Sequence, residues 1–319
     1  MLRTRVTEML GVAIPILQAP MSWVSRAQLV AATSEAGGFG ILEAGSGDLA
    51  AMTAEVASMA DRTGNPFGVN LPLNLLRNRS IEVAGYLDVV QAAGVKVLTT
   101  SAGDPRPVLP MLKARGFRVL HVVGTLAAAQ RAEEAGADGL IVEGSEGGGF
   151  KQPGGASTMV LLPLVTSNTD LPVVAAGGVV DGVSMAAAFA LGAEGVQMGT
   201  ALVASQESPV HANYKAALVA AAETDTVLLN ENTKPTIRAL RTAHSLALCG
   251  QVVTLAEFDR ADDLYRDGDM DASLAGAGQS VGRIDRIRPV AEILADTIAE
   301  FHATVARLAA SCAATGART

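Results

Sequence analysis

Short apolar runs alternate with amphipathic, helix-like segments through the first two thirds of the chain. Eight such runs recur at intervals of 22 to 33 residues, close to the roughly 30 residues of a strand–helix–strand unit. One residue inside each run marks its place: Leu17, Gly40, Val69, Val97, Val119, Ile141, Val174 and Val196. Eight strands at this spacing predict an α/β protein with a closed, parallel (β/α)8 TIM barrel, and fit an open doubly wound sheet less well.

Polar residues mark the starts of several predicted helices. Ser25 and Gln28 have the spacing of a capping box, in which each side chain accepts or donates a hydrogen bond at the first turn. Thr125 and Asp181 precede further helix-like segments, and their side chains can accept from free N–H groups there. We therefore expect helix N-termini at these three positions.

The strand rhythm stops after Thr200. Residues 208–282 contain helix-like stretches and an acidic, turn-rich segment but no strand alternation, and a final apolar helix follows Pro289. We predict a barrel formed by residues 1–207 and 283–319, with residues 208–282 as a helical insertion. The insertion is expected to lie over the barrel mouth on the substrate side, because it grows from the carboxyl end of the eighth strand.

The stretch from Leu171 to Thr200 predicts strand, Gly-Gly turn, helix, strand and Gly-Thr turn. Its strands end at Gly177-Gly178 and at Gly199, so main-chain N–H groups and a helix N-terminus can approach a phosphate closely. Such glycines can also simply tighten the turns between strand and helix. Two of these turns in succession favour a phosphate cradle.

Chemistry in a barrel belongs at the carboxyl ends of the strands. Those positions hold no pair of histidines with a carboxylate at ligand spacing, so we expect no metal centre. They also lack a Gly-x-Ser-x-Gly elbow and a P-loop. They offer an amide at Asn70 and a Gly-rich loop, Gly147 to Gly149, that we expect to be very flexible. With the phosphate cradle, this combination suits a phosphorylated cofactor that does the chemistry itself.

Composition narrows the class of protein further. The 319 residues are 49% hydrophobic and 18% charged, which excludes a disordered chain. A net charge of −8 without a basic block argues against a nucleic-acid partner. The sequence has no apolar run of about 18 residues and no secretory signal pattern, so we expect a cytoplasmic protein without a membrane partner. Cys249 and Cys312 lack metal spacing and are expected to be buried or incidental thiols.

Six segments, taken together in this order, resemble the nitronate monooxygenase (2-nitropropane dioxygenase-like) family of FMN-dependent TIM barrels. That family also contains the flavin-dependent enoyl-acyl-carrier-protein reductase and NADH:quinone reductases. The segments are QAPM at 18–21, GVNL at 68–71, EAGADGLIVEGSEGGG at 134–149, AAGGV at 175–179, GVQMGT at 195–200 and GQSVG at 278–282. The resemblance spans most of the chain and implies FMN as the cofactor.

The resemblance also implies roles for individual residues. The turns that hold the FMN phosphate correspond to Gly177, Gly178, Gly199 and Thr200. The first loop, which lies against the isoalloxazine ring, corresponds to Ala19, Pro20 and Met21, and the amide that bonds the flavin corresponds to Asn70. The positions near the ring or the ribityl chain correspond to His121, Glu143, Gly147, Gly148 and Gly149. Met21 as a core residue and Asn70 as a turn cap are the structural alternatives.

The chain departs from the family pattern directly after the Gly-rich loop. The family has a histidine there that serves nitronate oxidation as a base or an electrostatic partner, whereas this chain has Phe150. Phenylalanine exchanges no proton, so this residue counts against nitronate oxidation and predicts an apolar substrate side. Lys151 follows, either as a cation over a substrate carbonyl or nitro oxygen or as a solvated loop lysine. The basic stretch 234–241 either meets the phosphates of NAD(P)H or coenzyme A or is a charged helix end.

These residues favour an FMN-dependent oxidoreductase that uses NAD(P)H as co-substrate to reduce an enone, an enoyl thioester or a quinone, with Phe150 and Lys151 on the substrate side. A nitronate monooxygenase is the first alternative. A flavin-binding or acyl-thioester-binding protein with little turnover is the second, and a sugar-phosphate enzyme that uses the same cradle is the third. The sequence does not choose between NADH and NADPH, and it leaves the oligomeric state, a homodimer included, undecided.

Overall fold

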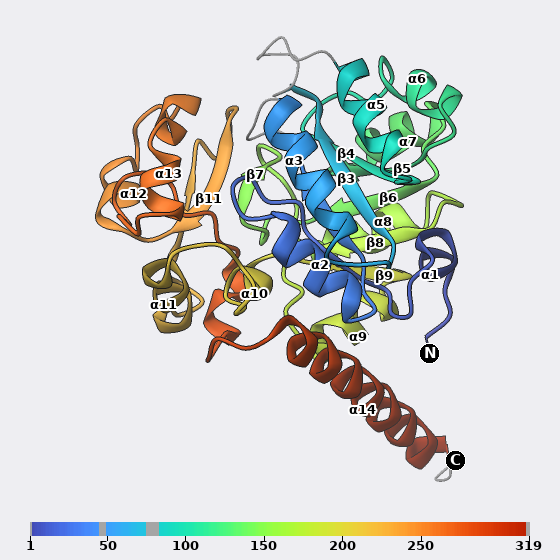
Figure 1. The fold of residues 1–319 in the computed structure, drawn as a ribbon. Helices are drawn as coiled ribbons and strands as arrows, with labels where there is room; N and C mark the ends of the chain where they lie inside the picture. The colour runs from blue at the N-terminus through green and yellow to red at the C-terminus, as the bar shows by residue number, and fades with distance from the viewer. Residues whose placement is uncertain (1, 45–48, 75–82, 317–319) are drawn as a thin grey trace.

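Eight parallel strands form the centre of the molecule (Figure 1). The computed structural model describes residues 2–44, 49–74 and 83–316. The strands are β1 (Ile16–Gln18), β2 (Gly40–Glu43), β3 (Phe67–Pro72), β4 (Val97–Ser101), β5 (Arg118–Val123), β6 (Gly139–Glu143), β8 (Val173–Ala176) and β9 (Gly195–Met198). Each of the eight predicted runs lies in one of them. Hydrogen bonds between β1 and the residue before β2 close the sheet, from Gln18 N to Phe39 O at 3.0 Å and from Phe39 N to Ile16 O at 2.9 Å. The predicted TIM barrel is confirmed.

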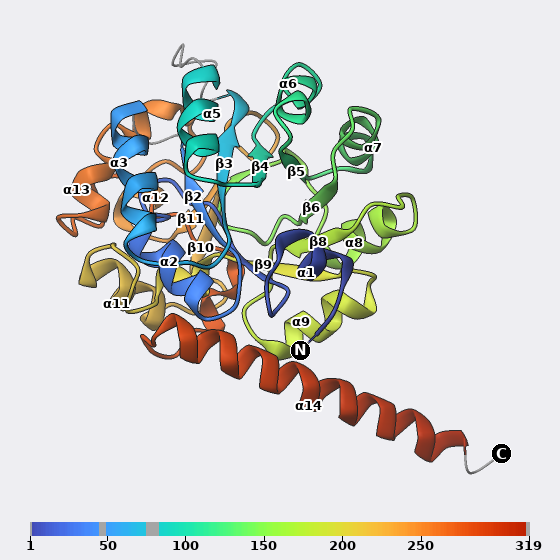
Figure 2. The same ribbon diagram turned by 45° about the vertical axis from the view of Figure 1, so that its right-hand side comes forward.

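Helices cover the outside of this barrel (Figures 1 and 2). They are α2 (Ala27–Glu35), α3 (Leu49–Ala60), α5 (Val83–Ala92), α6 (Leu109–Ala114), α7 (Leu126–Glu134), α8 (Thr158–Thr166), α9 (Gly182–Ala190), the short α10 (Thr200–Val203) and α14 (Val290–Gly316). The long α14 packs on α9 and α2, and its carboxyl-terminal half extends past the barrel (Figure 2). Among the described residues, no helix combines the length and the apolar character that crossing a bilayer demands.

The barrel strands are buried on both faces, and successive side chains alternate between two apolar clusters. The inner cluster contains Leu17, Ile41, Leu120 and Val174, and the outer cluster lies between the strands and the helices. Fully burying one such side chain stabilises the fold by about 1.5 to 3 kcal/mol. The alternation therefore decides which polar residues at the strand ends point inward.

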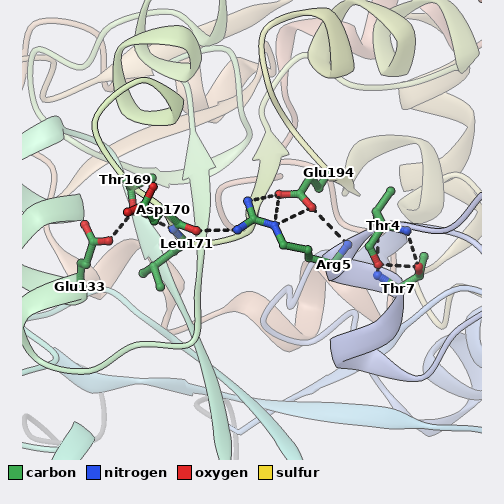
Figure 3. Close-up of polar contacts among 8 residues, drawn as sticks. All are labelled: Thr4, Arg5, Thr7, Glu133, Thr169, Asp170, Leu171 and Glu194. Atoms are coloured by element: carbon green, nitrogen blue, oxygen red, sulfur yellow. Dashed lines mark hydrogen bonds and ion pairs between the residues drawn. The ribbon is translucent and has the colours of Figure 1, made fainter.

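The amino-terminal end of the barrel is closed by α1 (Arg5–Leu10), whose Val6 and Leu10 join the inner cluster. Arg5 fixes this helix to the strands: its Nε donates to Glu194 Oε1 at 2.9 Å and its Nη1 donates to Asp170 O at 2.6 Å (Figure 3). Thr4 forms the capping box of the helix. This plug leaves the opposite end, where the strands end, for the site.

Two of the three predicted helix starts are confirmed. Thr125 accepts from Ala128 N, and Asp181 accepts from Ser184 N within a capping box. The prediction for Ser25 is wrong, because α2 begins at Ala27 without a side-chain cap from the residue before it. The Ser25 hydroxyl binds the preceding loop instead.

The prediction that residues 208–282 lack strands is wrong. They contain β10 (Thr226–Leu229) and β11 (Thr236–Leu240), which form an antiparallel sheet with β7 (Gly149–Lys151) from the barrel's Gly-rich loop. Side chains of β10 and β11 build a small separate core with Val253 and Leu274. The remaining elements are α11 (Ala212–Ala220), α12 (Ala243–Ala247), η1 (Leu255–Phe258), α13 (Ala261–Tyr265) and η2 (Gln279–Arg283). Figure 1 shows these elements beside β7.

Candidate active site at the carboxyl ends of the strands

Buried polar side chains line the inside of the barrel where β3 and β4 end. Thr99 Oγ1 donates to Asn70 Oδ1 at 2.9 Å, and Asn70 Nδ2 donates to Ser101 Oγ at 3.1 Å. Asn70 is buried. It bonds two side chains of the neighbouring strand, so the alternative of a turn cap does not apply. A carboxamide keeps a second N–H and a second lone pair, so Asn70 can bind one further polar group.

The first loop, which contains Ala19, Pro20 and Met21, is fixed by the buried hydroxyl of Ser25. Ser25 Oγ donates to Ala19 O at 3.0 Å and accepts from Met21 N at 2.7 Å and from Gln18 Nε2 at 2.7 Å. One donor and two acceptor positions are all that a hydroxyl has. The sequence pointed to Ser25 only as a helix cap, a role that it does not have.

The first loop lies against the turn after β9. A Cβ placed on Gly199 would lie 3.5 Å from Ala19 Cβ and 3.6 Å from Met21 Sδ. The structure thus brings together two segments that are 180 residues apart in sequence. Thr200 begins the short α10, and its Oγ1 accepts a hydrogen bond from Gly278 N at 3.0 Å. That contact joins the GQSVG segment to this turn.

The turn after β8 has the backbone that the glycine pair predicted. Gly177 and Gly178 have φ values of +85° and +77°, a region that glycine adopts without a steric penalty. A Cβ on Gly177 would lie 3.0 Å from Gly144 O, so this turn also packs closely on the end of β6. The N–H groups of the turn have no Cβ beside them, but two side chains lie next to it: the Thr158 hydroxyl would lie 3.1 Å from a Cβ on Gly177, and Glu146 Cβ 3.9 Å from a Cβ on Gly178.

The expected contribution of the α9 N-terminus is wrong. Gly182 N donates to Glu300 Oε2 at 2.9 Å and Ser184 N donates to Asp181 Oδ1 at 2.9 Å. A Cβ on Gly182 would lie 2.2 Å from Phe301 N, because α14 packs directly on this helix end. The candidate cradle therefore consists of the glycine turns and the start of α10, for which Gly199 is the N-cap.

The Gly-rich loop is held in place, contrary to the expectation of a very flexible loop. Gly149 begins β7, and a Cβ on Gly148 would lie 2.6 Å from Ala277 C. Arg238 Nε donates to Ser145 O at 3.0 Å. The basic stretch 234–241 is thus not a helix end, because most of it forms β11. The Arg238 side chain is occupied by its bond to Ser145 O, and burial lowers its pKa.

Glu143 and Lys151 form an ion pair beside this loop. The Lys151 side chain is only 3% exposed and that of Glu143 is 26% exposed. A Cβ on Gly147 would lie 2.6 Å from both Glu143 Oε1 and Lys151 Nζ. Lys151 is therefore not a solvated loop lysine, and Gly147 leaves the room in which the pair forms.

Phe150 lies between these polar groups in sequence but faces a different partner. Its side chain is 44% exposed, and its ring centroid is 5.4 Å from that of Phe258 in the insertion. The loop position that carries a histidine in the family pattern thus presents an apolar ring at the surface of the site.

His121 is not brought together with the inward-facing residues. It shares the outer face of β5 with Val119 and Val123, which belong to the cluster beneath the helices. Its Nδ1 lies 2.8 Å from Thr100 Oγ1, and burial lowers its pKa to about 4. His121 is thus neutral at physiological pH, and the placement predicted near a flavin does not agree with the strand's alternation.

Gln197 is a candidate site residue that the sequence did not single out. It is buried and lies between Val196 and Met198, both in the outer cluster, so its side chain points inward. Its Oε1 has no hydrogen-bond partner among the described residues. A buried acceptor left without a partner costs about 1 to 3 kcal/mol, so a ligand N–H or O–H there would be favourable. The available signal was a glutamine within the apolar run GVQM.

Fold and candidate site together define a (β/α)8-barrel protein with glycine turns and buried polar side chains at the carboxyl ends of the strands. The chain belongs to the nitronate monooxygenase family, whose family model matches residues 3–300. The family assignment made from six short segments is confirmed.

Two relatives illustrate how varied the family is. The (3aS,4S,5R,7aS)-5-hydroxy-7a-methyl-1-oxo-octahydro-1H-indene-4-carboxyl-CoA dehydrogenase of Rhodococcus jostii (strain RHA1) is 37% identical over 227 residues, which cover 71% of this chain and 62% of that protein. A probable nitronate monooxygenase of Staphylococcus saprophyticus is 32% identical over 271 residues, covering 72% and 76%. The chain thus matches about three fifths of the length of the first relative.

Solved structures of the family superpose over nearly the whole chain. FabK from Thermotoga maritima is 36% identical with a TM-score of 0.88, covering 98% of this chain and 100% of that one. A nitroalkane oxidase from Streptomyces ansochromogenes is 29% identical with a TM-score of 0.83, covering 96% and 100%. Their similarity includes the residues of the insertion.

Proposed function

We propose that this chain binds FMN at the carboxyl end of the barrel and is an NAD(P)H-dependent reductase of an organic acceptor. Bound FMN would supply the redox chemistry, taking a hydride from the nicotinamide and passing electrons to an enone, an enoyl thioester or a quinone. The glycine turns at Gly177-Gly178 and Gly199 would hold the phosphate, and Thr200 stands at the second turn. This assignment rests on backbone geometry that leaves N–H groups accessible.

The buried polar side chains Asn70 and Gln197 could bond the ring and the ribityl chain of FMN. Asn70 has one N–H and one lone pair left, and Gln197 Oε1 has no partner in the described structure. Both are groups that a flavin's polar ring edge or ribityl hydroxyls would satisfy. Met21, beside Gly199, offers an adaptable apolar surface against a flat ring.

The observation that carries the choice of a reductase is the exposed Phe150 ring. A residue at this position with no ionisable group can neither remove a proton from a substrate nor bind its charge. It can exclude water and contact an apolar or conjugated acceptor. Lys151 follows Phe150 directly in the chain, and the Glu143–Lys151 pair is a candidate to hold a proton or to bind a carbonyl oxygen.

A CoA thioester leads the set of acceptors that we propose to test. The name of the Rhodococcus relative describes a dehydrogenase of the CoA thioester of a bicyclic indene derivative, and FabK aligns with the whole chain. We therefore propose a screen that compares crotonyl-CoA, a cyclic enone and a benzoquinone.

Anaerobic stopped-flow mixing tests the proposal. The purified protein should show a flavin spectrum, and NADH or NADPH should bleach it, followed by recolouring on addition of an acceptor. Photoreduction of the same sample is the control that the bound flavin can be reduced. Bleaching by light but by neither nicotinamide would overturn the reductase proposal, and a colourless protein that cannot be reconstituted with FMN would overturn the cofactor.

Nitronate oxidation is the second candidate, because the family model and the Staphylococcus relative both carry that name. It predicts that propionate-3-nitronate bleaches the flavin anaerobically without nicotinamide. A yellow protein that neither the nitronate nor a nicotinamide reduces would favour a binding protein with little turnover.

A further inference from the structure

Five aromatic side chains form one continuous line between the barrel and the insertion. Consecutive ring centroids are 5.4 Å, 6.0 Å, 5.6 Å and 5.5 Å apart, within the range of favourable aromatic pairs. In order, the rings are Phe150, Phe258, Trp23, Tyr265 and Tyr214. The chain has only one Trp, three Tyr and seven Phe, so nearly half of its aromatic residues gather here. We call this set the aromatic line.

The aromatic line joins three segments that are distant in sequence. Trp23 comes from the first loop, Phe150 from β7 and Phe258 from η1 of the insertion. Tyr214 and Tyr265, at the other end, are 1% and 6% exposed, whereas Phe150 is 44% exposed. The buried end therefore braces the line, and the end at Phe150 leaves ring surface exposed.

Trp23 holds the middle of the line in an unusual backbone conformation. Its φ is +64°, which is rare for a bulky residue and points to a constraint imposed by its surroundings. The turn around it is closed by Val24 N and Ser25 N, which both donate to Met21 O. Its ring is nearly parallel to those of Phe258 and Tyr265, at 8° to each. The loop that contains Met21 thus positions Trp23 against the insertion.

We propose that Phe150 and Phe258, supported by Trp23, form a specificity surface that binds a ring system of the substrate by aromatic and apolar contact. The Phe150 and Phe258 rings are tilted by 43°, so they offer a face and an edge at once, which suits a flat or alicyclic ring better than an extended chain. The assignment of this ring to the acceptor rests on the proposed function. The binding of rings by this surface is independent of the proposed function.

Two matched ketones can measure this preference without turnover. The holoprotein is titrated with 1-indanone and with 2-heptanone in the absence of NAD(P)H, by calorimetry and by the emission of Trp23, the only tryptophan. We expect Phe150→Leu and Phe258→Leu each to weaken 1-indanone binding about five- to tenfold, as loss of an aromatic pair predicts. Binding of 2-heptanone should change less than twofold, because leucine keeps the apolar contact.

Phe189→Leu is the matched control, because Phe189 also pairs with a ring, that of Phe301 at 5.0 Å, but between α9 and α14. It should leave both ketones unaffected. Equal losses for the two ketones, or wild-type 1-indanone affinity in both variants at the site, would overturn the inference. A protein that selects 1-indanone but is not reduced by NAD(P)H would refute the proposed function and leave this surface standing.

Discussion

The Lys151 ammonium pairs with the Glu143 carboxylate across the space left by Gly147. One partner comes from the end of a barrel strand and the other from β7, the strand that the barrel contributes to the insertion's sheet. The pair therefore fixes the position of the loop that carries Phe150. It also places a cation directly after Phe150 in the chain, on a side chain that is only 3% exposed.

Removing the cation should destabilise the protein measurably. We expect Lys151→Met to lower the free energy of unfolding by about 2 kcal/mol, less than for a fully buried pair because Glu143 keeps some contact with water. The double variant Glu143→Gln with Lys151→Met should recover most of this loss, as a double-mutant cycle in urea would show.

Lys113→Met is the control for this prediction. Lys113 pairs with Asp138 at 2.5 Å, but its side chain is 36% exposed, so its loss should cost at most about 1 kcal/mol. Equal effects of the two lysine variants would contradict a special role for the Glu143–Lys151 pair.

Gly178→Ala should weaken FMN binding beyond its effect on stability. Gly178 has a φ of +77°, and an added Cβ would have its nearest neighbour at 3.9 Å, so the methyl group meets strain rather than a clash. The strain costs about 1 to 2 kcal/mol. We expect FMN affinity, measured by fluorescence titration of the apoprotein, to fall about tenfold as the turn changes shape.

Gly94→Ala separates strain from cofactor binding. Gly94 has a similar φ of +74° with open space around it, and it follows α5 on the outside of the barrel. Its alanine variant should lose a similar amount of stability and keep its FMN affinity. The cradle assignment fails if both variants bind FMN alike.

The sequence predicted the barrel well because parallel strands buried on both faces appear as unbroken apolar runs. It did not predict β10 and β11, which are both short. The side chains of β10 are half buried, and β11 carries the charged Arg238 at its centre. Neither strand reads as a buried run, and the partner β7 has only three residues. Their pairing depends on contacts between distant segments, which local patterns do not contain.

The positions of the candidate site residues could be predicted only in part, for a related reason. The glycine turns and Asn70 follow directly from strand ends and a shared family pattern. The face that His121 occupies cannot be predicted in this way, because a strand that is buried on both faces gives no sign of which side is inward. The same ambiguity hid Gln197, whose inward direction becomes evident only from the packing of its neighbours.

His121 should make the protein more sensitive to acid. Its pKa is lowered to about 4 by burial, against about 6.5 in the unfolded chain. The unfolded state therefore binds a proton first, so stability is full above pH 6.5 and is lost as the pH falls towards 4. The loss should reach about 2 to 3 kcal/mol. Urea unfolding of His121→Gln should show a flatter dependence over this range.

His302→Gln is the control, because His302 is exposed on α14. This variant controls for the replacement of a histidine by glutamine outside the barrel core, and His121→Gln is compared with its pH curve and with that of the wild type. If His121→Gln also follows that curve, His121 does not titrate as its burial implies, and its outward placement in the core would have to be reconsidered.

Ser25→Ala should release the first loop from the site. The hydroxyl donates to Ala19 O and accepts from Met21 N and Gln18 Nε2. Gln18 Nε2 also donates to Ala19 O, so the loss of the hydroxyl mainly leaves Met21 N without this partner, at a cost of about 1 to 3 kcal/mol. Because the same turn holds Trp23 at a positive φ, we expect the Trp23 emission to shift to the red and FMN binding to weaken.

Ser34→Ala provides the comparison. Ser34 is equally buried and donates to Pro66 O at 3.0 Å, but it lies at the end of α2 before β2. That variant should lose stability with unchanged Trp23 emission and FMN affinity, whereas a Ser25→Ala protein with wild-type emission would show that the hydroxyl does not set the loop.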